Sequence, residues 1–289
     1  MDAQLADVAA GERFYGELFG WSFRPSHGGT VWAYREGRSV AALAQKTDGR
    51  LPTVWTVYFA TPDARALTVR IRAAGGQVVT APVPVGELGV TALATDPEGA
   101  VFGLWQPGTH AGFGLRHAPG AFVWAELYAR DTATANTFYG GLFHDALFGP
   151  DAEPDVGRAP VTTVFPALMP PHFLVHFGVV DCAAALGEVT RLGGRIQAGP
   201  FDTSYGTVGG WRWTTRGRRS RCCSAEPPPA GRPGPRRRPS VRHPLPEYVQ
   251  RHPQCRLVRN LWPGQEESGC VPPRRCGGET LHGVAHICG

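Results

Sequence analysis

The sequence predicts an α+β protein built from four similar strand–helix–strand modules, two in each of two domains. The segment ERFYGELFG at residues 12–20 returns as NTFYGGLFH at residues 136–144. A second pair, residues 54–79 and residues 172–196, keeps one order: an apolar strand-like run, an aspartate, an amphipathic run and two glycines. These two repeats indicate that the second domain duplicates the first.

Each module contains one predicted helix with recognisable ends. In both copies of the first repeat, Phe, Tyr, Leu and Phe fall at i, i+1, i+4 and i+5, which places an apolar stripe on one side of a helix. The aspartates Asp7, Asp63, Asp131 and Asp181 precede the four helices, where a carboxylate accepts hydrogen bonds from first-turn amides. The paired glycines supply the left-handed backbone that ends a helix.

Charge and cysteine content divide the chain near residue 209. The net charge is +5, but residues 209–289 hold 15 arginines against 5 glutamates, which leaves 14 basic and 19 acidic residues in 1–208. That part lacks the basic face that nucleic-acid binding requires. It contains one of the seven cysteines, Cys182, and the chain has neither a long apolar run nor a secretory leader pattern. We therefore expect a soluble, cytoplasmic protein that binds neither nucleic acid nor membrane.

The order of these motifs resembles the vicinal oxygen chelate superfamily, which includes glyoxalase I, bleomycin-resistance proteins and extradiol dioxygenases. The resemblance lies in FYGELFGW at residues 14–21 and TALATDPEGAVFGLWQPG at residues 91–108, and it extends to about residue 208. It implies tandem βαβββ modules whose sheets curl into a cup around a small ligand, with the two domains paired within one chain. The expected organisation is domain 1 at 1–108, a linker at 109–121 and domain 2 at 122–208.

Residues 209–289 do not continue this pattern. GGWRWTTRGRRSRCC at 209–223 stands where domain 2 should repeat GVTALATDPEGAVFGLW at 89–105. One lysine against 28 arginines indicates GC-rich codons. Back-translation of residues 211–214, read from the third base of each codon, gives Val/Leu-Ala-Val/Leu-Asp, and further reading gives an Asp-Pro-type turn and another strand. We interpret residues 209–289 as an out-of-frame, disordered tail that truncates domain 2 and leaves an unpaired edge beside residues 172–179.

Three other readings of the tail remain open. Its arginines and prolines fit a basic tail that binds nucleic acid or anionic lipid. Its cysteines and histidines after residue 254 fit a zinc site only loosely, because no CxxC pair occurs. A secreted disulfide module would need a secretory leader.

The resemblance also indicates where metal ligands would stand. The first-strand position is Trp124 in domain 2 and precedes the first residue in domain 1. The position six before the capping Asp of the next module is Val57 or Val175, and the last-strand position is Gly103. On the strand at 39–45, Gln45 is the side chain that could act as a ligand. None is His, Asp, Glu or Cys, so no metal residue is predicted and the cofactor is unknown.

A polar and aromatic set on the first strands is the candidate site. Alternation puts Trp124, Glu126 and Tyr128 on one strand face, toward the cup, while Asp2 and Gln4 occupy the places of Glu126 and Tyr128 in domain 1. Burial among aromatic rings disfavours an ionised carboxyl group, so Glu126 or Asp2 could act as a general base or hold a cationic ligand. The alternative is a carboxylate that only holds loop amides or a domain interface.

Further candidates lie on the strands that open the second module of each domain. Tyr58 and His176 are equivalent, and a shift of one residue decides whether His176 faces the cup or packs beneath a helix. Aromatic residues are expected either to line the cup or to pack in the core. They are Trp55, Phe59, Trp105 and Phe177.

Three functions follow as hypotheses. One is a glyoxalase- or dioxygenase-type enzyme that acts on a small organic molecule with Glu126 or Asp2 as its proton-transfer group. Another is a protein of the bleomycin-resistance kind that sequesters a ligand without turnover. The third is a frameshifted product with no function.

Overall fold

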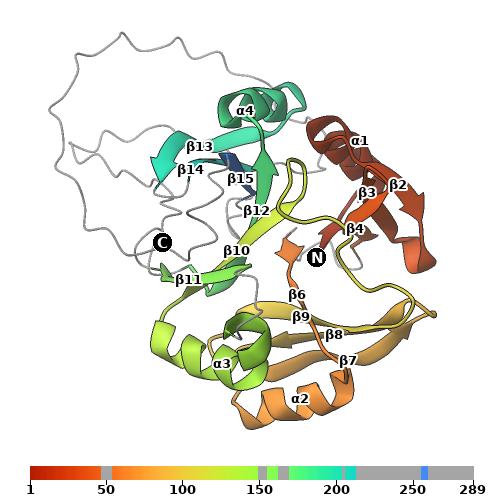
Figure 1. The fold of residues 1–289 in the computed structure, drawn as a ribbon, viewed down its shortest axis with the longest axis vertical. Coiled ribbons are helices and arrows are strands. Elements are labelled where there is room, and N and C mark those ends of the chain that lie inside the picture. Colours follow the sequence, from red (N-terminus) through yellow and green to blue (C-terminus); the bar gives the residue numbers. More distant parts are fainter. Residues whose placement is uncertain (47–53, 149–154, 162–168, 204–205, 213–254, 260–289) are drawn as a thin grey trace, which may run out of the picture.

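The computed structural model describes residues 1–46, 54–148, 155–161, 169–203, 206–212 and 255–259 (Figure 1). Within these ranges the chain forms three β-sheets and four α-helices. The architecture is mixed α+β with small sheets, as the sequence predicts, and its modules are consistent with βαβββ units.

The N-terminal half, residues 1–107, holds two modules. Its elements are β1 (Asp2–Leu5), α1 (Val8–Phe19), β2 (Ser22–Pro25), the short 3-10 helix η1 (His27–Gly29), β3 (Val31–Arg35), β4 (Arg38–Gln45), β5 (Trp55–Thr56), β6 (Tyr58–Ala60), α2 (Ala64–Ala73), β7 (Gln77–Val85), β8 (Gly89–Thr95) and β9 (Val101–Pro107). One sheet has the order β2-β3-β4-β1-β5 and the other β6-β9-β8-β7. Only Val57 separates β5 from β6, so a nearly continuous strand links the two sheets.

The C-terminal half, residues 122–259, holds two helices and a single six-stranded sheet within the described ranges. Its elements are β10 (Phe122–Ala129), α3 (Thr132–Phe148), β11 (Val156–Pro160), β12 (His172–Val179), α4 (Cys182–Arg191), β13 (Arg195–Thr203), β14 (Gly206–Arg212) and β15 (Cys255–Arg259). The strand order is β11-β10-β12-β15-β14-β13. The strands that open its two modules, β10 and β12, pair antiparallel, as β1 and β5 do in the N-terminal half.

The predicted helix ends are confirmed. The carboxylates of Asp7, Asp63 and Asp181 each accept a 2.9 Å hydrogen bond from the amide three residues on. Asp131 does the same from Ala133 N, two residues on, before α3. The first glycine of each Gly-Gly pair has the expected positive φ, 89° and 84°. Local sequence therefore sets where each helix begins and ends.

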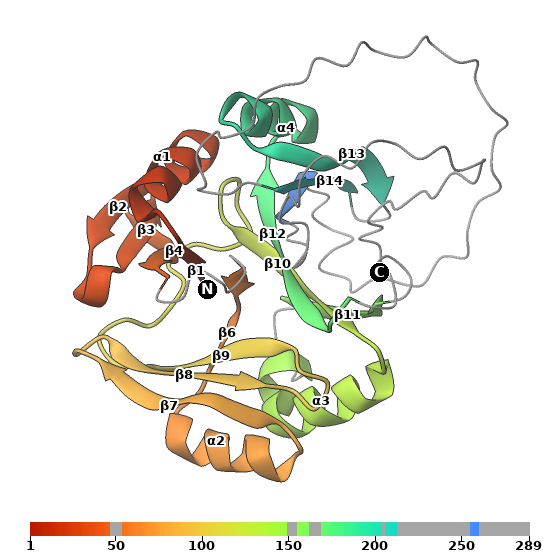
Figure 2. The same ribbon diagram turned by 180° about the vertical axis from the view of Figure 1, so that it is seen from behind.

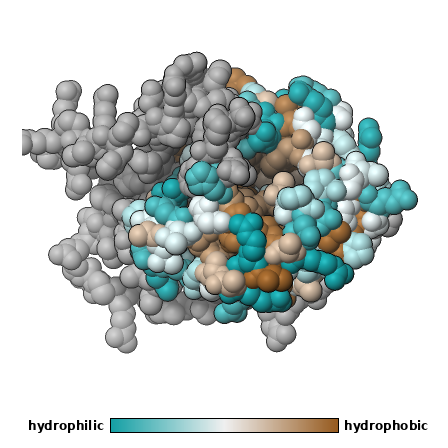
Figure 3. Space-filling view, turned by 60° about the horizontal axis from the view of Figure 1, so that its bottom comes forward, coloured by the Kyte–Doolittle hydropathy of each residue, from teal (hydrophilic) through white to brown (hydrophobic). Residues whose placement is uncertain are grey.

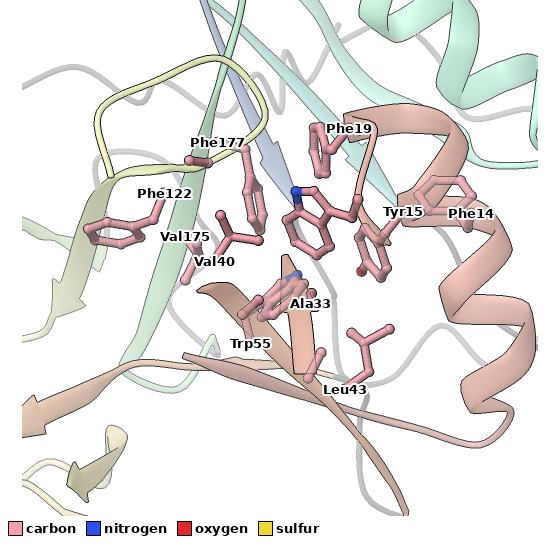
Figure 4. Packing of buried hydrophobic residues seen from close by; sticks show 14 of the residues in the cluster. Phe14, Tyr15, Phe19, Ala33, Val40, Leu43, Trp55, Phe122, Val175 and Phe177 are labelled. Atoms are coloured by element: carbon pink, nitrogen blue, oxygen red, sulfur yellow. The ribbon is translucent and has the colours of Figure 1, made fainter. Parts of the chain in front are cut away.

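Two apolar cores join the halves. The first gathers side chains of β1 and α1 with those of β12 and α4, and Figure 4 shows Phe19, Trp55 and Phe177 among its members. The Phe177 ring centroid lies 4.9 Å from that of Phe19 and 5.3 Å from that of Trp55. The second joins α2 and β9 to α3 and β10. Beside the second core, the hydroxyl of Tyr139 on α3 donates to the buried carboxylate of Asp96 in the turn before β9 (3.2 Å). The helices of the two halves therefore lie side by side, as both views show (Figures 1 and 2).

The expected unpaired edge beside residues 172–179 is wrong. β15, which comes from the predicted tail, pairs antiparallel with β12 and parallel with β14. β14 also continues to Arg212, past the expected boundary at residue 208. An open sheet edge offers free amides and carbonyls to any extended segment, which accounts for the pairing. The rest of the predicted tail, 213–254 and 260–289, lies outside the described residues.

The expected linker is packed against both halves. The Ser39 hydroxyl donates to the Gly112 carbonyl (2.8 Å), and the Trp21 indole donates to the Gly120 carbonyl (2.6 Å). Toward the C-terminal half, Arg116 forms an ion pair with Asp155, just before β11. These contacts fix the segment between β9 and β10 as part of the structure.

The surface shows apolar and polar side chains side by side on the face seen in Figure 3. Val69 on α2 and Val79 on β7 are among the exposed apolar residues. Within the described ranges, no helix combines the length and the apolar character needed to cross a membrane.

Candidate functional site

The N-terminal half contains a hydrogen-bonded carboxylate–tyrosine pair. Asp2 on β1 lies opposite Ala42 of β4 and Thr56 of β5, and the Tyr58 hydroxyl donates to its Oδ2 (3.0 Å). The Tyr58 ring crosses Gly103 of β9, where any Cβ atom would overlap it. Glycine at 103 therefore makes room for the ring that reaches Asp2.

Burial sets the charge state of this pair. Burial raises the pKa of Asp2, while the Met1 ammonium and hydroxyl hydrogen bonds from Tyr58 and Thr56 partly oppose that rise. Burial and the Asp2 carboxylate raise the pKa of Tyr58 far above its ordinary value of 10.0, so its hydroxyl stays protonated. Tyr58 is thus a permanent hydrogen-bond donor to Asp2 at neutral pH.

Three aromatic side chains stand near this pair. Trp32 of β3 is paired with Ala42, in the same cross-strand row as Asp2, and Trp105 of β9 lies two residues beyond Gly103. His110, from the segment after β9, packs against Trp32 with ring centroids 4.0 Å apart and lies 6.0 Å from Trp105. We call these three residues with Asp2 and Tyr58 the N-terminal cluster. Gln4 lies two residues along β1 from Asp2, opposite Ala44.

The C-terminal half carries a matching set on β10 and β12. Glu126 pairs with Leu174, while Trp124 and Tyr128 pair with His176 and His172. Directly paired residues of antiparallel strands project to the same face, so the described register brings all of these side chains together. We call Trp124, Glu126, Tyr128, His172 and His176 the C-terminal cluster.

A neighbour on its own strand, β10, positions the Glu126 carboxylate. The Trp124 indole donates to Glu126 Oε2 (2.7 Å), and Gly157 of β11 leaves space for the Trp124 ring beside the carboxylate. Glu126 is 4% exposed and His176 is fully buried. The Tyr128 and His172 rings stack with centroids 5.6 Å apart, and burial lowers the pKa of His172. The cluster combines a buried carboxylate with imidazoles that can carry protons.

The two clusters are equivalent by register. Asp2, Tyr58, Glu126 and His176 each stand five residues before the aspartate that caps the following helix. In each half, the carboxylate lies on the strand that opens the first module. Asp2 pairs directly with Thr56, and Tyr58 lies two residues further along. Glu126 likewise pairs with Leu174, and His176 lies two residues further along. His176 therefore occupies the place that Tyr58 fills beside Asp2.

Several predicted positions are corrected by this register. His176 does not pack beneath a helix, because its direct partner is Trp124 on the face opposite α3 and α4. Phe177, Trp55 and Phe59 do not join the clusters but pack in the two apolar cores, as Figure 4 shows for the first two. Val57 and Val175 also face the first core. The strand pairing thus selects the one-residue shift that the sequence left open for His176.

Trp32 and His110 were not singled out in the sequence. They are 78 positions apart, and neither lies within a repeated motif. Pairing of β3 with β4 and the fold of the linker bring them to Trp105. No local signal in the sequence indicates that contact.

The superfamily's metal positions do not fit a divalent metal. Gly103 offers no donor atom, and the Tyr58 ring fills the space beside it. The neighbours of Val57 and Val175 on the cluster face are Thr56, Tyr58, Leu174 and His176. Of these four, only His176 is a strong ligand for a divalent metal. Gln45 donates to the Ala6 carbonyl instead (3.0 Å). Within the described part of the chain, no three His, Cys, Asp or Glu side chains are grouped to hold a metal ion.

Comparison with known proteins assigns the chain to a family. A family model described as a glyoxalase-like domain matches residues 1–105. An anthracycline biosynthesis protein of a Streptomyces species (strain C5) is 35% identical over 235 residues, covering 71% of this chain and 85% of the relative. The chain belongs to the glyoxalase-like family.

A mycobacterial relative agrees with this assignment. A Mycobacterium bovis protein named "Putative glyoxylase CFP32" is 32% identical over 220 residues, covering 70% of this chain and 84% of its own. Among solved structures, a Mn(II)-bound glyoxalase from Novosphingobium aromaticivorans is 17% identical with a TM-score of 0.47, covering 70% of this chain and 73% of that one.

Proposed function

We propose that this glyoxalase-like protein binds a small organic molecule in its C-terminal half and transfers a proton with Glu126 and His176. The register that carries Glu126, His172 and His176 on one face supports this most directly. An imidazole can take up and release a proton during a reaction, whereas the hydroxyl of the equivalent Tyr58 in the N-terminal half stays protonated. The C-terminal cluster is therefore the better candidate for acid–base chemistry, with Glu126 in preference to Asp2.

The substrate class is a small carbonyl or aromatic compound. Relatives carry names that refer to anthracycline biosynthesis and to glyoxylase activity. These names suggest a screen with the methylglyoxal–glutathione adduct, catechols and basic aromatic antibiotics, anthracyclines included. Proton abstraction beside a carbonyl or phenol is the reaction that a buried carboxylate and a neutral imidazole favour.

Glu126→Gln tests this proposal, with Asp2→Asn as the matched control in the other half. We expect Glu126→Gln to lower turnover at least a hundredfold, within the usual contribution of a general base, while Asp2→Asn keeps turnover. The thermal midpoint of Glu126→Gln should stay close to that of the parent. A loss of about 1–3 kcal/mol of stability with turnover retained would instead identify Glu126 as a structural carboxylate.

A second candidate is ligand sequestration without turnover. The aromatic residues around both carboxylates favour it, because stacking and a carboxylate hold a flat cation without chemistry. Binding of an unchanged ligand, measured at one molecule per chain and lost in Glu126→Gln, would support this function over catalysis.

A third candidate is that residues from about 209 onward are read out of frame and the product has no function. β9 runs antiparallel to β8 and parallel to β6, but β15 runs parallel to β14 and antiparallel to β12. β15 thus fills the place of β9 in the opposite direction. Trp211 also stands opposite Ile196 where Ala94 stands opposite Val78. These departures, one in β15 and one at the end of β14, support the interpretation that residues after about 209 were not selected for this sheet.

Resequencing the gene around codon 209 tests this interpretation, together with the intact mass of the product. We expect a base change that restores Asp-Pro and an apolar strand after β14. The corrected protein should be more soluble than the 289-residue chain. An in-frame strand equivalent to β9 would bury apolar surface on the sheet of the C-terminal half. An uninterrupted frame with a mass that matches all 289 residues would refute the frameshift.

A further inference from the structure

The N-terminal cluster has features of a ligand site that the proposed chemistry does not use. Asp2 Oδ2 accepts from Tyr58, but its buried Oδ1 has no hydrogen-bond partner of normal geometry in the described ranges, although the Thr56 hydroxyl is near enough to favour the ionised form. A buried carboxylate oxygen without a full set of partners is costly, and a bound donor removes that cost.

The charges around Asp2 leave it without a strong cation at neutral pH. Among the described residues, no arginine or lysine forms an ion pair with it. The Met1 amine is its charged neighbour, and burial lowers the pKa of that amine to about 6. Burial also lowers the pKa of His110, which is therefore neutral above pH 7. A cationic group from a ligand would meet an uncompensated carboxylate.

Trp32 and Trp105 offer aromatic surface at a suitable distance from the Asp2 carboxylate. Trp32, Ala42 and Asp2 form one row across β3, β4 and β1, so Ala42 contributes only a methyl group between the indole and the carboxylate. Two strand spacings amount to about 10 Å. A flat tricyclic cation can cover such a distance with its own ring system. Trp32 and Trp105 are both only partly buried, so their faces are accessible near the surface.

His110 now occupies part of that stacking place. Its ring lies 4.0 Å from Trp32, while the Trp105 indole donates to the His110 carbonyl (2.9 Å). The backbone of residue 110 is thus anchored, and the side chain can rotate without breaking that bond. The imidazole is tilted by 51° from the indole plane and covers part of the indole that a flat ring would contact.

We propose that the N-terminal cluster is a second ligand site, which takes a flat organic cation in place of the His110 ring and pairs its protonated nitrogen with Asp2. The indole of Trp32 stacks on the ring system, while Trp105, inclined at 69° to Trp32, borders the ring edge. Cation–π attraction adds to the pairing. Tyr58 holds the carboxylate in position. No metal takes part, since the Tyr58 ring occupies the space beside Gly103. Binding here is independent of proton transfer by Glu126.

Binding of aminoacridine to the 289-residue chain tests the proposal, with neutral acridine and anthracene carboxylate as probes of the same shape. We expect aminoacridine to bind at least tenfold more tightly than either. Asp2→Asn and Trp32→Leu should each weaken it at least tenfold, whereas Glu126→Gln leaves it unchanged. His110→Ala should tighten it severalfold, because no ring has to be displaced. Circular dichroism checks that each variant is folded.

The pH dependence gives a separate measurement. Between pH 4 and pH 8, a rise in pH favours the carboxylate form of Asp2 and the neutral forms of Met1 and His110, so every group that faces the site favours cation binding more at high pH. Affinity should therefore rise over this range in the parent and rise less in Asp2→Asn. Equal affinity for the three probes would overturn the proposal. Loss of binding in Glu126→Gln with binding retained in Asp2→Asn would place the ligand in the C-terminal half and overturn it as well.

Discussion

The two halves of the chain place a carboxylate at the same register position but give it different neighbours. In the N-terminal half, Asp2 accepts from Tyr58, whose hydroxyl keeps its proton. In the C-terminal half, Glu126 accepts from Trp124 and shares its strand face with His176. A tyrosine with a strongly raised pKa fixes a carboxylate, whereas an imidazole can exchange protons with one. One residue in the partner strand thus separates the proposed binding site from the candidate catalytic site.

The C-terminal half also differs in how its sheet is completed. A turn of five residues joins β8 to β9, and such a short connection makes neighbouring strands antiparallel. β15 follows β14 after 42 intervening residues and enters in the reverse direction. The comparison teaches that sheet position and strand direction are separate constraints, and that an open edge enforces only the first.

Tyr58→Ala is the change with the largest expected effect on this comparison. The Tyr58 ring fills the space over Gly103, so its removal should leave a cavity and cost about 3–5 kcal/mol of unfolding free energy. Chemical denaturation measures this loss. Tyr34→Ala is the control. Both tyrosines are partly exposed, but the Tyr34 ring on β3 faces the Arg24 guanidinium (4.6 Å) and does not fill the space over a glycine, so its removal should cost less. Equal losses at the two positions would show that Tyr58 is not packed as described.

Asp2→Asn should have a smaller effect that depends on pH. Because burial raises the pKa of Asp2, its contribution to stability is fully present below its ordinary pKa of 3.8 and is lost as pH rises through the folded-state value. Asparagine does not ionise, so the parent should gain stability relative to Asp2→Asn as pH falls from 7 to 4. Denaturation at both pH values measures a difference of about 1 kcal/mol, typical of one buried hydrogen bond. A difference that grows with pH instead would show that Asp2 is stabilised in its charged form.

The sequence by itself determined the helices and the character of the strand faces. Asp7 and Asp181 cap helices because their side chains satisfy local amides, and this requires no distant contact. The alternation of Trp124, Glu126 and Tyr128 with small and aliphatic residues on β10 was likewise enough to place them on one face. The family followed from motifs of the same local kind.

Only the tertiary structure decided which residues meet. The face of His176 depends on how β12 joins α4 through the bend at Val180, and a one-residue change in that connection reverses every side chain of the strand. Trp32 reaches Trp105 and His110 through strand pairing and a packed linker, contacts between residues far apart in the sequence. The Tyr58 ring lies over Gly103 because two strands from different parts of a module pair in parallel. Such contacts depend on the packing of the whole chain, which no local pattern encodes.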